Sequence, residues 1–348
     1  MLRRRRAVVP IVAAVLAVSS CGVGVEPDPD TLTYASFGGT FTAGQQAAWQ
    51  EPWTEATGMR FANTSPSDPV LIRAQVGTGS VLWDLADVTP YFARQYCGEL
   101  VEPLDLPDVD RSQYDPSLIG DCYFGAYRFG LLISYDTERW PDPETAPRTV
   151  ADFFDPVKFP GRRGVVSDVA NGMLEYGALA DGVAPEDLYP LDVDRAFTSW
   201  DRIKDDTTFA ANNGALLQQA TGGQVDMMML VSARTAAVMD EGAPFTPVWD
   251  TTMISFNTLV VPKGAPNRDK AMDFLEFVLR PEQSAKFAEL TGTSPTNDAA
   301  RPHLKGNEGR VDAMNPSVNT GRSITTDPEW WGEHYTEVAE RYLGWLNG

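Results

Sequence analysis

The sequence predicts an α/β protein built from strands and helices that alternate along the chain. From Leu32 to Val88, short segments with alternating apolar residues are each followed by a segment with helical spacing. Hydrophobic residues make up 43% of the 348 residues and charged residues 22%, a balance that allows a large buried core. A chain of this length usually forms two domains, and alternating strands and helices are typical of parallel sheets.

The first elements form a β-α-β-α-β series. In chain order the patterns predict a strand at 32–37, a helix at about 43–56, a strand at 59–62, a helix at 70–76, a strand at 83–88 and a helix from about Pro90. Gly58 suits a helix end, and proline suits a first helical turn. The carboxyl ends of parallel strands share one edge, where ligands bind in open α/β folds. We therefore expect the ring of Phe37, beside Gly38 and Gly39, to face a ligand.

The remaining elements continue the alternation. The patterns predict a strand at 127–135 that runs between two lobes, a helix at about 193–204 capped by Asp192, strands at 224–231 and 255–262, and helices at 269–279, 281–290 and 333–346. Several conspicuous side chains in these segments are expected to belong to the core and not to a site: Trp83, Asp84, Met227, Met228, Met229, Trp330, Trp331, Tyr342 and Trp345. Asn212 and Asn213 either form a turn, which we favour, or line a cleft.

The first twenty-one residues have the pattern of an export signal. Four arginines at 3–6 precede a short apolar run at 7–17, and the small residues of 18–20 lead to Cys21. A run of about eleven apolar residues is shorter than the ~20 that span a bilayer. We expect residues 1–20 to be a lipoprotein signal peptide, Cys21 to carry the lipid, and residues 21–30 to be a flexible tether. An ordinary cleaved signal and a membrane anchor are the alternatives.

This interpretation gives the location and the redox setting of the protein. The chain would be exported and lipid-anchored to the outer face of the cell membrane, or periplasmic in a Gram-negative cell. Cys97 and Cys122 are the two cysteines that follow Cys21. In an exported protein such an even pair indicates a disulfide, and two buried thiols are the alternative.

Charge and motifs exclude several classes of function. The formal net charge of −20 argues against nucleic acid or anionic lipid headgroups as partners. His303 and His334 are the two histidines, and they are too far apart in sequence for a metal-binding pair. The segment from Asp108 begins like a calcium loop, but Gln113 and Ile119 stand where that loop needs glycine and glutamate.

Nucleophile-elbow, phosphate-loop and dinucleotide motifs are absent from the sequence. We expect no catalysis, no metal and no cofactor, although a hydrolase with a carboxylate pair would leave no short motif.

Several segments in the same order resemble one family, the solute-binding proteins of ABC importers of the spermidine/putrescine type. These segments are Phe37-Gly38-Gly39-Thr40, residues 181–197, residues 261–267, residues 279–283, Ser294-Pro295-Thr296-Asn297, residues 327–331 and residues 345–346. Cys97 and Cys122 match a cysteine pair found in one branch of that family. The resemblance implies a type II periplasmic-binding-protein fold, in which each of two lobes is a mixed sheet flanked by helices and the ligand cleft lies between them. Lobe 1 would comprise 31–134 and 258–303, and lobe 2 would comprise 135–257 and 304–348.

The resemblance also implies a function. The protein would be a monomer that captures a small organic solute by closure of its lobes and delivers it to permease subunits in the membrane. A polyamine-like or amino compound is the expected solute. A solute sensor or interaction lipoprotein on the same fold, without transport, is the alternative from another class.

Residues for the ligand site are carried over from the matching positions. They are Phe37, Gly38, Gly39, Thr40, Tyr91, Asp168, Asn171, Ser232, Arg234, Ser255, Phe256 and Asn257. In polyamine-binding relatives, rings cover the methylene chain and carboxylates hold the ammonium groups. Here Asn171 and Asn257 occupy positions where acids are expected, and a tryptophan expected near Ser232 is absent. Arg234 could instead bind an anionic solute through a bidentate contact, or it could form a structural salt bridge.

Overall fold

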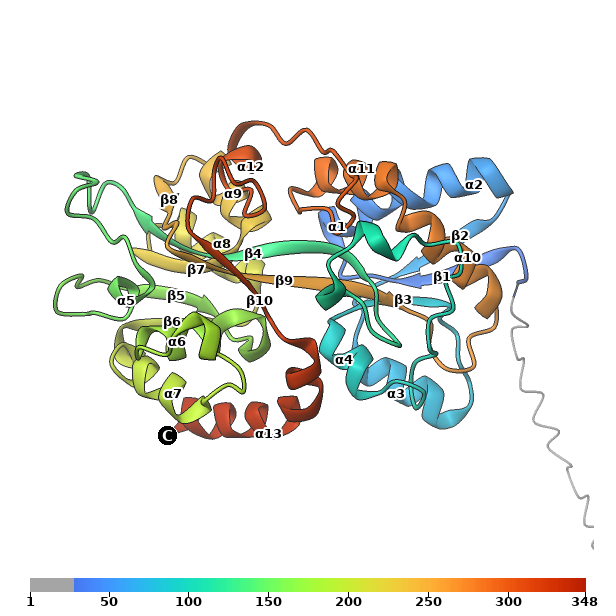
Figure 1. Cartoon of the computed structure of the whole chain (residues 1–348), viewed down its shortest axis with the longest axis horizontal. Coiled ribbons are helices and arrows are strands. Elements are labelled where there is room, and N and C mark those ends of the chain that lie inside the picture. Colours follow the sequence, from blue (N-terminus) through green and yellow to red (C-terminus); the bar gives the residue numbers. More distant parts are fainter. Residues whose placement is uncertain (1–27) are drawn as a thin grey trace, which may run out of the picture.

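The computed structural model describes residues 28–348. The expected signal peptide, Cys21 and most of the expected tether lie outside the described residues. A ten-stranded sheet runs through the molecule in the order β2-β1-β3-β9-β4-β7-β5-β6, with β10 paired to β9 and β8 paired to β4. Helices flank the sheet in two groups, one at each end (Figure 1). We refer to the group around β1–β3 as the first half and to the group around β5–β7 as the second half.

The first half contains the expected β-α-β-α-β series, with β1 between β2 and β3 and all three strands parallel. Its elements are β1 (Thr31–Ala35), α1 (Gly39–Gln45), the π-helical turn η1 (Gln46–Gln50), α2 (Glu51–Thr57), β2 (Arg60–Thr64), α3 (Pro69–Thr78), β3 (Leu85–Val88), α4 (Pro90–Gln95), α10 (Arg268–Val278) and α11 (Pro281–Thr291). The helix expected at 43–56 begins earlier, because Gly38 and Gly39 adopt φ angles of 87° and 59° that turn the chain out of β1 at once.

The second half contains another parallel set, in which β5 lies between β6 and β7. Its elements are α5 (Val150–Phe153), β5 (Arg163–Val166), the π-helical turn η4 (Val169–Met173), α6 (Leu174–Ala180), α7 (Val193–Asp201), β6 (Thr207–Ala210), α8 (Asn213–Thr221), β7 (Met227–Val231), α9 (Ser232–Asp240), β8 (Phe245–Pro247) and α12 (Gly306–Arg310). The predicted cap of α7 is confirmed, because Asp192 accepts a hydrogen bond from the backbone N–H of Arg195 at 3.1 Å.

Three segments pass between the halves (Figure 1). The long antiparallel strands β4 (Gly125–Asp136) and β9 (Thr251–Val260) contribute to both ends of the sheet. The third segment is the chain between α11 and α12 (292–305), after which β10 (Arg322–Thr325) pairs with β9 and leads into α13 (Pro328–Asn347) (Figure 1). Helix α13 begins five residues earlier than expected, since Asp327 accepts hydrogen bonds from the backbone N–H groups of Glu329 and Trp330.

Helix α13 contacts both halves. The ring of Tyr335 stacks on Tyr91 of α4 with centroids 4.6 Å apart. On the other side, the indole of Trp331 donates to the buried carboxylate of Glu175 at 2.7 Å. Trp331 and Tyr342 are buried, Trp330 and Trp345 are partly buried, and all four pack on the core of the second half, as expected.

The remaining core predictions are confirmed as well. Met227, Met228 and Met229 are fully buried in β7. Trp83 is buried in the first half, and Asp84 accepts hydrogen bonds from the backbone N–H groups of Thr33 (2.8 Å) and Asn267 (2.7 Å).

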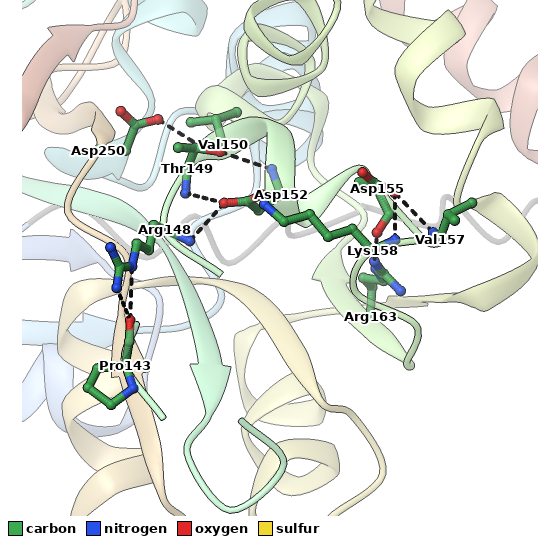
Figure 2. Close-up of polar contacts among 10 residues, drawn as sticks. All are labelled: Pro143, Arg148, Thr149, Val150, Asp152, Asp155, Val157, Lys158, Arg163 and Asp250. Carbon is green, nitrogen blue, oxygen red and sulfur yellow. Dashed lines mark hydrogen bonds and ion pairs between the residues drawn. The ribbon is translucent and has the colours of Figure 1, made fainter. Parts of the chain in front are cut away.

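A dense set of polar contacts fixes the loops on the outer side of the second half (Figure 2). Thr149 and Asp152 form a capping box at the start of α5, and Lys158 donates to Asp152 at 2.8 Å. Asp250, from the chain just before β9, accepts from the backbone N–H of Val150 at 3.0 Å. Arg163 is fully buried nearby and donates to four backbone carbonyls, those of Phe153, Asp155, Phe159 and Gly161.

Cys97 and Cys122 form a disulfide across 25 residues. Replacing both cysteines by serine is expected to lower the free energy of unfolding by about 3.5 kcal/mol, because an open loop of this length gains entropy in the unfolded chain. Chemical denaturation of the variant and of the oxidised parent measures the difference. Equal midpoints, or two titratable thiols in the native parent, would contradict the prediction.

Candidate ligand-binding site

A cavity of about 580 Å³ lies between the two halves. Its walls come from both halves and from the crossing strands β4 and β9. The lining residues are Phe37, Gly38, Phe41, Pro66, Thr89, Tyr127, Phe129, Leu131, Val165, Val166, Asp168, Asn171, Met173, Asn212, Asn213, Gly214, Met229, Val231, Ala233, Arg234, Asn257 and Thr293. A volume of this size is in the usual range for small-molecule sites.

The parallel strands of both halves point their carboxyl ends at the cavity. In the first half, Phe37 and Gly38 follow β1, Pro66 follows β2, and Thr89 follows β3. In the second half, Asp168 follows β5, Asn212 follows β6, and Arg234 follows β7. The predicted location of the site at this edge of the sheet is therefore where the structure has its cavity.

Asp168 is one of two charged side chains in the lining. Its carboxylate accepts a hydrogen bond from the Asn171 side-chain amide and another from the backbone N–H of Ala170 at 3.3 Å. Burial raises the pKa of Asp168 above its ordinary value, and these two donors partly offset the effect. Asp168 forms no ion pair with any of residues 28–348, so its charge remains available to a cationic group.

The position of Asn171 is fixed from the crossing strand β9. Ser255 donates to Oδ1 of Asn171 at 2.8 Å, while Nδ2 of Asn171 donates to Asp168. The next residue, Gly172, has φ 107° and lies so close to β9 that an added Cβ would be 2.7 Å from Met253. A side chain there would push the turn away from the strand and displace Asn171.

Arg234 is the second charged side chain in the lining. It lies in the first turn of α9, and its guanidinium reaches across to Phe41 of α1, 5.8 Å from the ring centroid. Within the described part of the chain, Arg234 makes no salt bridge. The structural salt bridge considered from the sequence is therefore absent there, and the guanidinium faces the cavity.

Between these two charges the cavity wall is largely apolar and aromatic. Phe37, the ring that the sequence predicts to face a ligand, is 46% exposed and lines the cavity. Tyr127, Phe129 and Leu131 alternate along β4 and all line the cavity. The ring of Tyr127 packs on Phe41 with centroids 5.6 Å apart, which makes a continuous aromatic surface.

The structure brings six of the twelve predicted residues into the lining: Phe37, Gly38, Asp168, Asn171, Arg234 and Asn257. The other six lie elsewhere. Gly39 and Thr40 are exposed at the start of α1, Ser232 is buried at the start of α9, and Phe256 is buried against Tyr123. Ser255 supports Asn171 from behind. Tyr91 turns its ring toward α13, because Pro90 starts a helix that presents Tyr91 to Tyr335.

Asn212 and Asn213 combine the two alternatives considered from the sequence. Asn212 caps α8 by accepting from the backbone N–H of Ala215 at 2.9 Å, and both asparagines line the cavity. The preference for a turn alone was wrong, because the helix that this cap begins points its first turn at the cleft.

Sequence reasoning missed most of the apolar lining and one buried acid behind it. The period of two along β4 could have placed Tyr127, Phe129 and Leu131 on one face. Asp87 of β3 is fully buried behind the wall, where it accepts hydrogen bonds from Gln45 (2.7 Å), Tyr127 (2.9 Å) and Asn257 (3.2 Å). An acid in the middle of a strand is the signal that could have drawn attention to it.

Neither a metal site nor a membrane-spanning helix is found among residues 28–348. No group of three or more His, Cys, Asp or Glu side chains is placed to hold a metal ion. No helix in that range is long and apolar enough to cross a membrane.

Comparison with known proteins places the chain among transport proteins. The family model described as bacterial extracellular solute-binding protein matches residues 48–309. The gamma-aminobutyric acid-binding protein of Pseudomonas aeruginosa is 29% identical over 324 residues, which cover 90% of each chain. The spermidine/putrescine-binding periplasmic protein of Escherichia coli K12 is 22% identical over 216 residues, 62% of this chain and 60% of that protein. The solved structure of the Atu4243–GABA receptor has a TM-score of 0.82 at 30% identity and covers 91% of this chain and 97% of that chain.

Proposed function

Because the chain belongs to the family of bacterial extracellular solute-binding proteins, we propose that its cavity captures a small zwitterionic amino compound, such as gamma-aminobutyric acid (GABA), for an ABC importer. One observation carries the choice of ligand. The two charged residues of the lining, Asp168 and Arg234, have opposite signs and follow the adjacent strands β5 and β7. A compound with one ammonium and one carboxylate group satisfies both.

Each charged residue suits one end of such a ligand. The guanidinium of Arg234 matches a carboxylate through two parallel hydrogen bonds. The carboxylate of Asp168 can accept from an ammonium group, whose positive charge would favour the ionised form of a buried acid. The rings of Phe37, Phe41 and Tyr127 would cover the methylene chain between the two ends.

The same two residues favour an amino acid over a polyamine. A diamine would place its second ammonium group near Arg234, and like charges in a buried site cost affinity. The similarity to the GABA-binding protein of Pseudomonas aeruginosa, which extends over most of both chains, supports this choice.

The two halves of the molecule would close on the solute as two lobes. Residues 31–134 with 258–303 would move as one lobe, and residues 135–257 with 304–348 as the other. A ligand that touches both lobes binds the closed form better than the open form and so shifts the population toward closure. The protein would act as a monomer, held by a lipid on Cys21, and would deliver the solute to permease subunits.

A thermal-shift screen tests the ligand class. At a concentration of 100 times its Kd, GABA is expected to stabilise the protein by about 2.7 kcal/mol, because it binds the folded chain alone. Butyrate lacks the ammonium group and putrescine lacks the carboxylate, so both should give much smaller shifts. Titration calorimetry then gives the Kd. A larger shift with putrescine than with GABA would refute the zwitterion proposal.

A further inference from the structure

Asp87 is a buried acid that accepts hydrogen bonds from side chains on α1, β4 and β9. It lies on β3, close to Thr89 of the cavity lining, and its exposed fraction is 0%. One carboxylate oxygen accepts from Gln45 Nε2 at 2.7 Å and from the hydroxyl of Tyr127 at 2.9 Å. The other accepts from Asn257 Nδ2 at 3.2 Å.

No cation in the described chain compensates this charge. The groups that face Asp87 are the phenols of Tyr34 on β1 and Tyr127 on β4, and the neutral amides of Gln45 on α1 and Asn257 on β9. Burial raises the pKa of Asp87 to about 7, although the hydrogen bonds from Tyr127, Asn257 and Gln45 act in the opposite direction. An uncompensated buried carboxylate lowers the stability of the folded state, and such groups are concentrated at functional sites.

Asp87 determines how the side chain of Asn257 is oriented. Nδ2 of Asn257 donates to Asp87 and also lies 3.1 Å from the Tyr127 hydroxyl, so both of its hydrogens point away from the cavity. Oδ1 accepts no hydrogen bond from residues 28–348 and is not one of the fully buried oxygens. Since Asn257 lines the cavity, this oxygen faces the ligand space.

We propose that Asp87 is a positioning residue, which holds the Asn257 amide with its oxygen toward the cavity so that this wall recognises an N–H or O–H donor of the ligand. The inference rests on the proposed solute-binding role of the cavity and adds a requirement to it. The ligand must offer donor hydrogens to Asp168 on one side and to Asn257 on the other, as a single ammonium group can. A carboxylate placed against Asn257 would meet an acceptor and be disfavoured.

The substitution Asp87→Asn tests this role, since it keeps the size of the side chain and removes the charge. At pH 8 we expect the Kd for GABA to rise about tenfold, because the charged ammonium group of the ligand would lose its hydrogen bond to the Asn257 oxygen. The Tm should not fall at that pH, because the variant no longer buries a charge. The raised pKa of Asp87 means that its protonated form favours the folded parent fully below about pH 4 and that this contribution is lost as pH rises to about 7, so the advantage of the variant in Tm should grow over that range and then stay constant.

The pH profile separates positioning from simple packing. The ratio of the two Kd values should be near tenfold at pH 8 and approach one at pH 5.5, where Asp87 of the parent is protonated. Asp168 titrates in both proteins, so its contribution cancels in this ratio. A matched control is Asp84→Asn, which alters a buried acid of the same half that faces backbone N–H groups and not the cavity. It should leave the GABA affinity and its pH profile unchanged.

Two further measurements decide the outcome. In the Asn257→Ala background, Asp87→Asn should have little additional effect on Kd, because the residues act as one unit. Without any ligand, the side-chain amide signals of Asn257 in NMR spectra should titrate near pH 7 in the parent and not in Asp87→Asn. A Kd ratio that does not change with pH, or amide signals that do not titrate, would overturn the inference even if GABA binds. Titrating signals in a protein that binds putrescine and not GABA would support the positioning role and refute only the proposed ligand class.

Discussion

Replacing Arg234 by alanine is expected to weaken GABA binding roughly a thousandfold, about 4 kcal/mol. The guanidinium lines the cavity, has no carboxylate partner in the described chain and lies 5.8 Å from the ring of Phe41 in the opposite half. Removing it leaves the ligand carboxylate desolvated and unpaired when the halves close, and the loss of one partner of a buried charge pair costs several kcal/mol. Titration calorimetry of the parent and the variant measures the change.

Two controls isolate the electrostatic part of this effect. Arg202→Ala removes an arginine of the same half that pairs with Asp181 on the surface, and it should leave the affinity unchanged. Asp168→Asn should weaken GABA binding while having little effect on any binding of butyrate, because butyrate lacks the ammonium group. A mild effect of Arg234→Ala on GABA, together with a severe effect of Asp168→Asn, would instead indicate a ligand recognised through its amine alone.

Replacing Arg163 by alanine is expected to lower the free energy of unfolding by about 4 kcal/mol. Arg163 is fully buried and has no carboxylate partner in the described chain, and it donates to the carbonyls of Phe153 (3.2 Å), Phe159 (2.7 Å), Gly161 (2.5 Å) and Asp155 (3.4 Å). Alanine would leave several of these carbonyls without donors and would create a cavity where the guanidinium is buried. Denaturant unfolding followed by fluorescence gives the value.

The adjacent residue provides a matched comparison. Arg162 is largely exposed and pairs at 3.0 Å with the buried Asp226, which also accepts from the backbone N–H of residue 162 at 2.7 Å. Because alanine keeps that second hydrogen bond, Arg162→Ala should cost about 1 kcal/mol, well below the effect of Arg163→Ala. Similar losses for Arg162→Ala and Arg163→Ala would show that the buried hydrogen bonds contribute little net stability.

Much of the secondary structure could be predicted because its signals are local. Gly58 and Gly292 end helices, Asp192 and Pro90 begin them, and the apolar spacing of 269–279 and 281–290 matches α10 and α11. The resemblance to ABC-importer solute-binding proteins is confirmed, and with it the fold. The disulfide between Cys97 and Cys122 is present in the structure as well.

The face that each element presents to the cavity depended on contacts between distant segments. Tyr91 resembles a ligand-facing ring in sequence, but Tyr335, from the last helix of the chain, packs on it. Ser255 and Asn257 lie two residues apart on β9 and have different roles. Ser255 donates a hydrogen bond to Asn171, whereas Asn257 donates one to Asp87. Spacing along the chain carries no information about either partner.

The course of α13 has a practical consequence. The described chain starts beside β1 at the outer end of the first half, and it finishes on the second half, where the indole of Trp345 donates to Asp201 at 2.6 Å (Figure 1). The two ends of the described chain, at Asp28 and Gly348, therefore lie on different halves of the molecule (Figure 1). Probes joined near each end would change their separation whenever the halves rotate, and neither probe would occupy the cavity. With the proposed closure, such a pair of probes would report solute binding without any insertion into the folded parts of the chain.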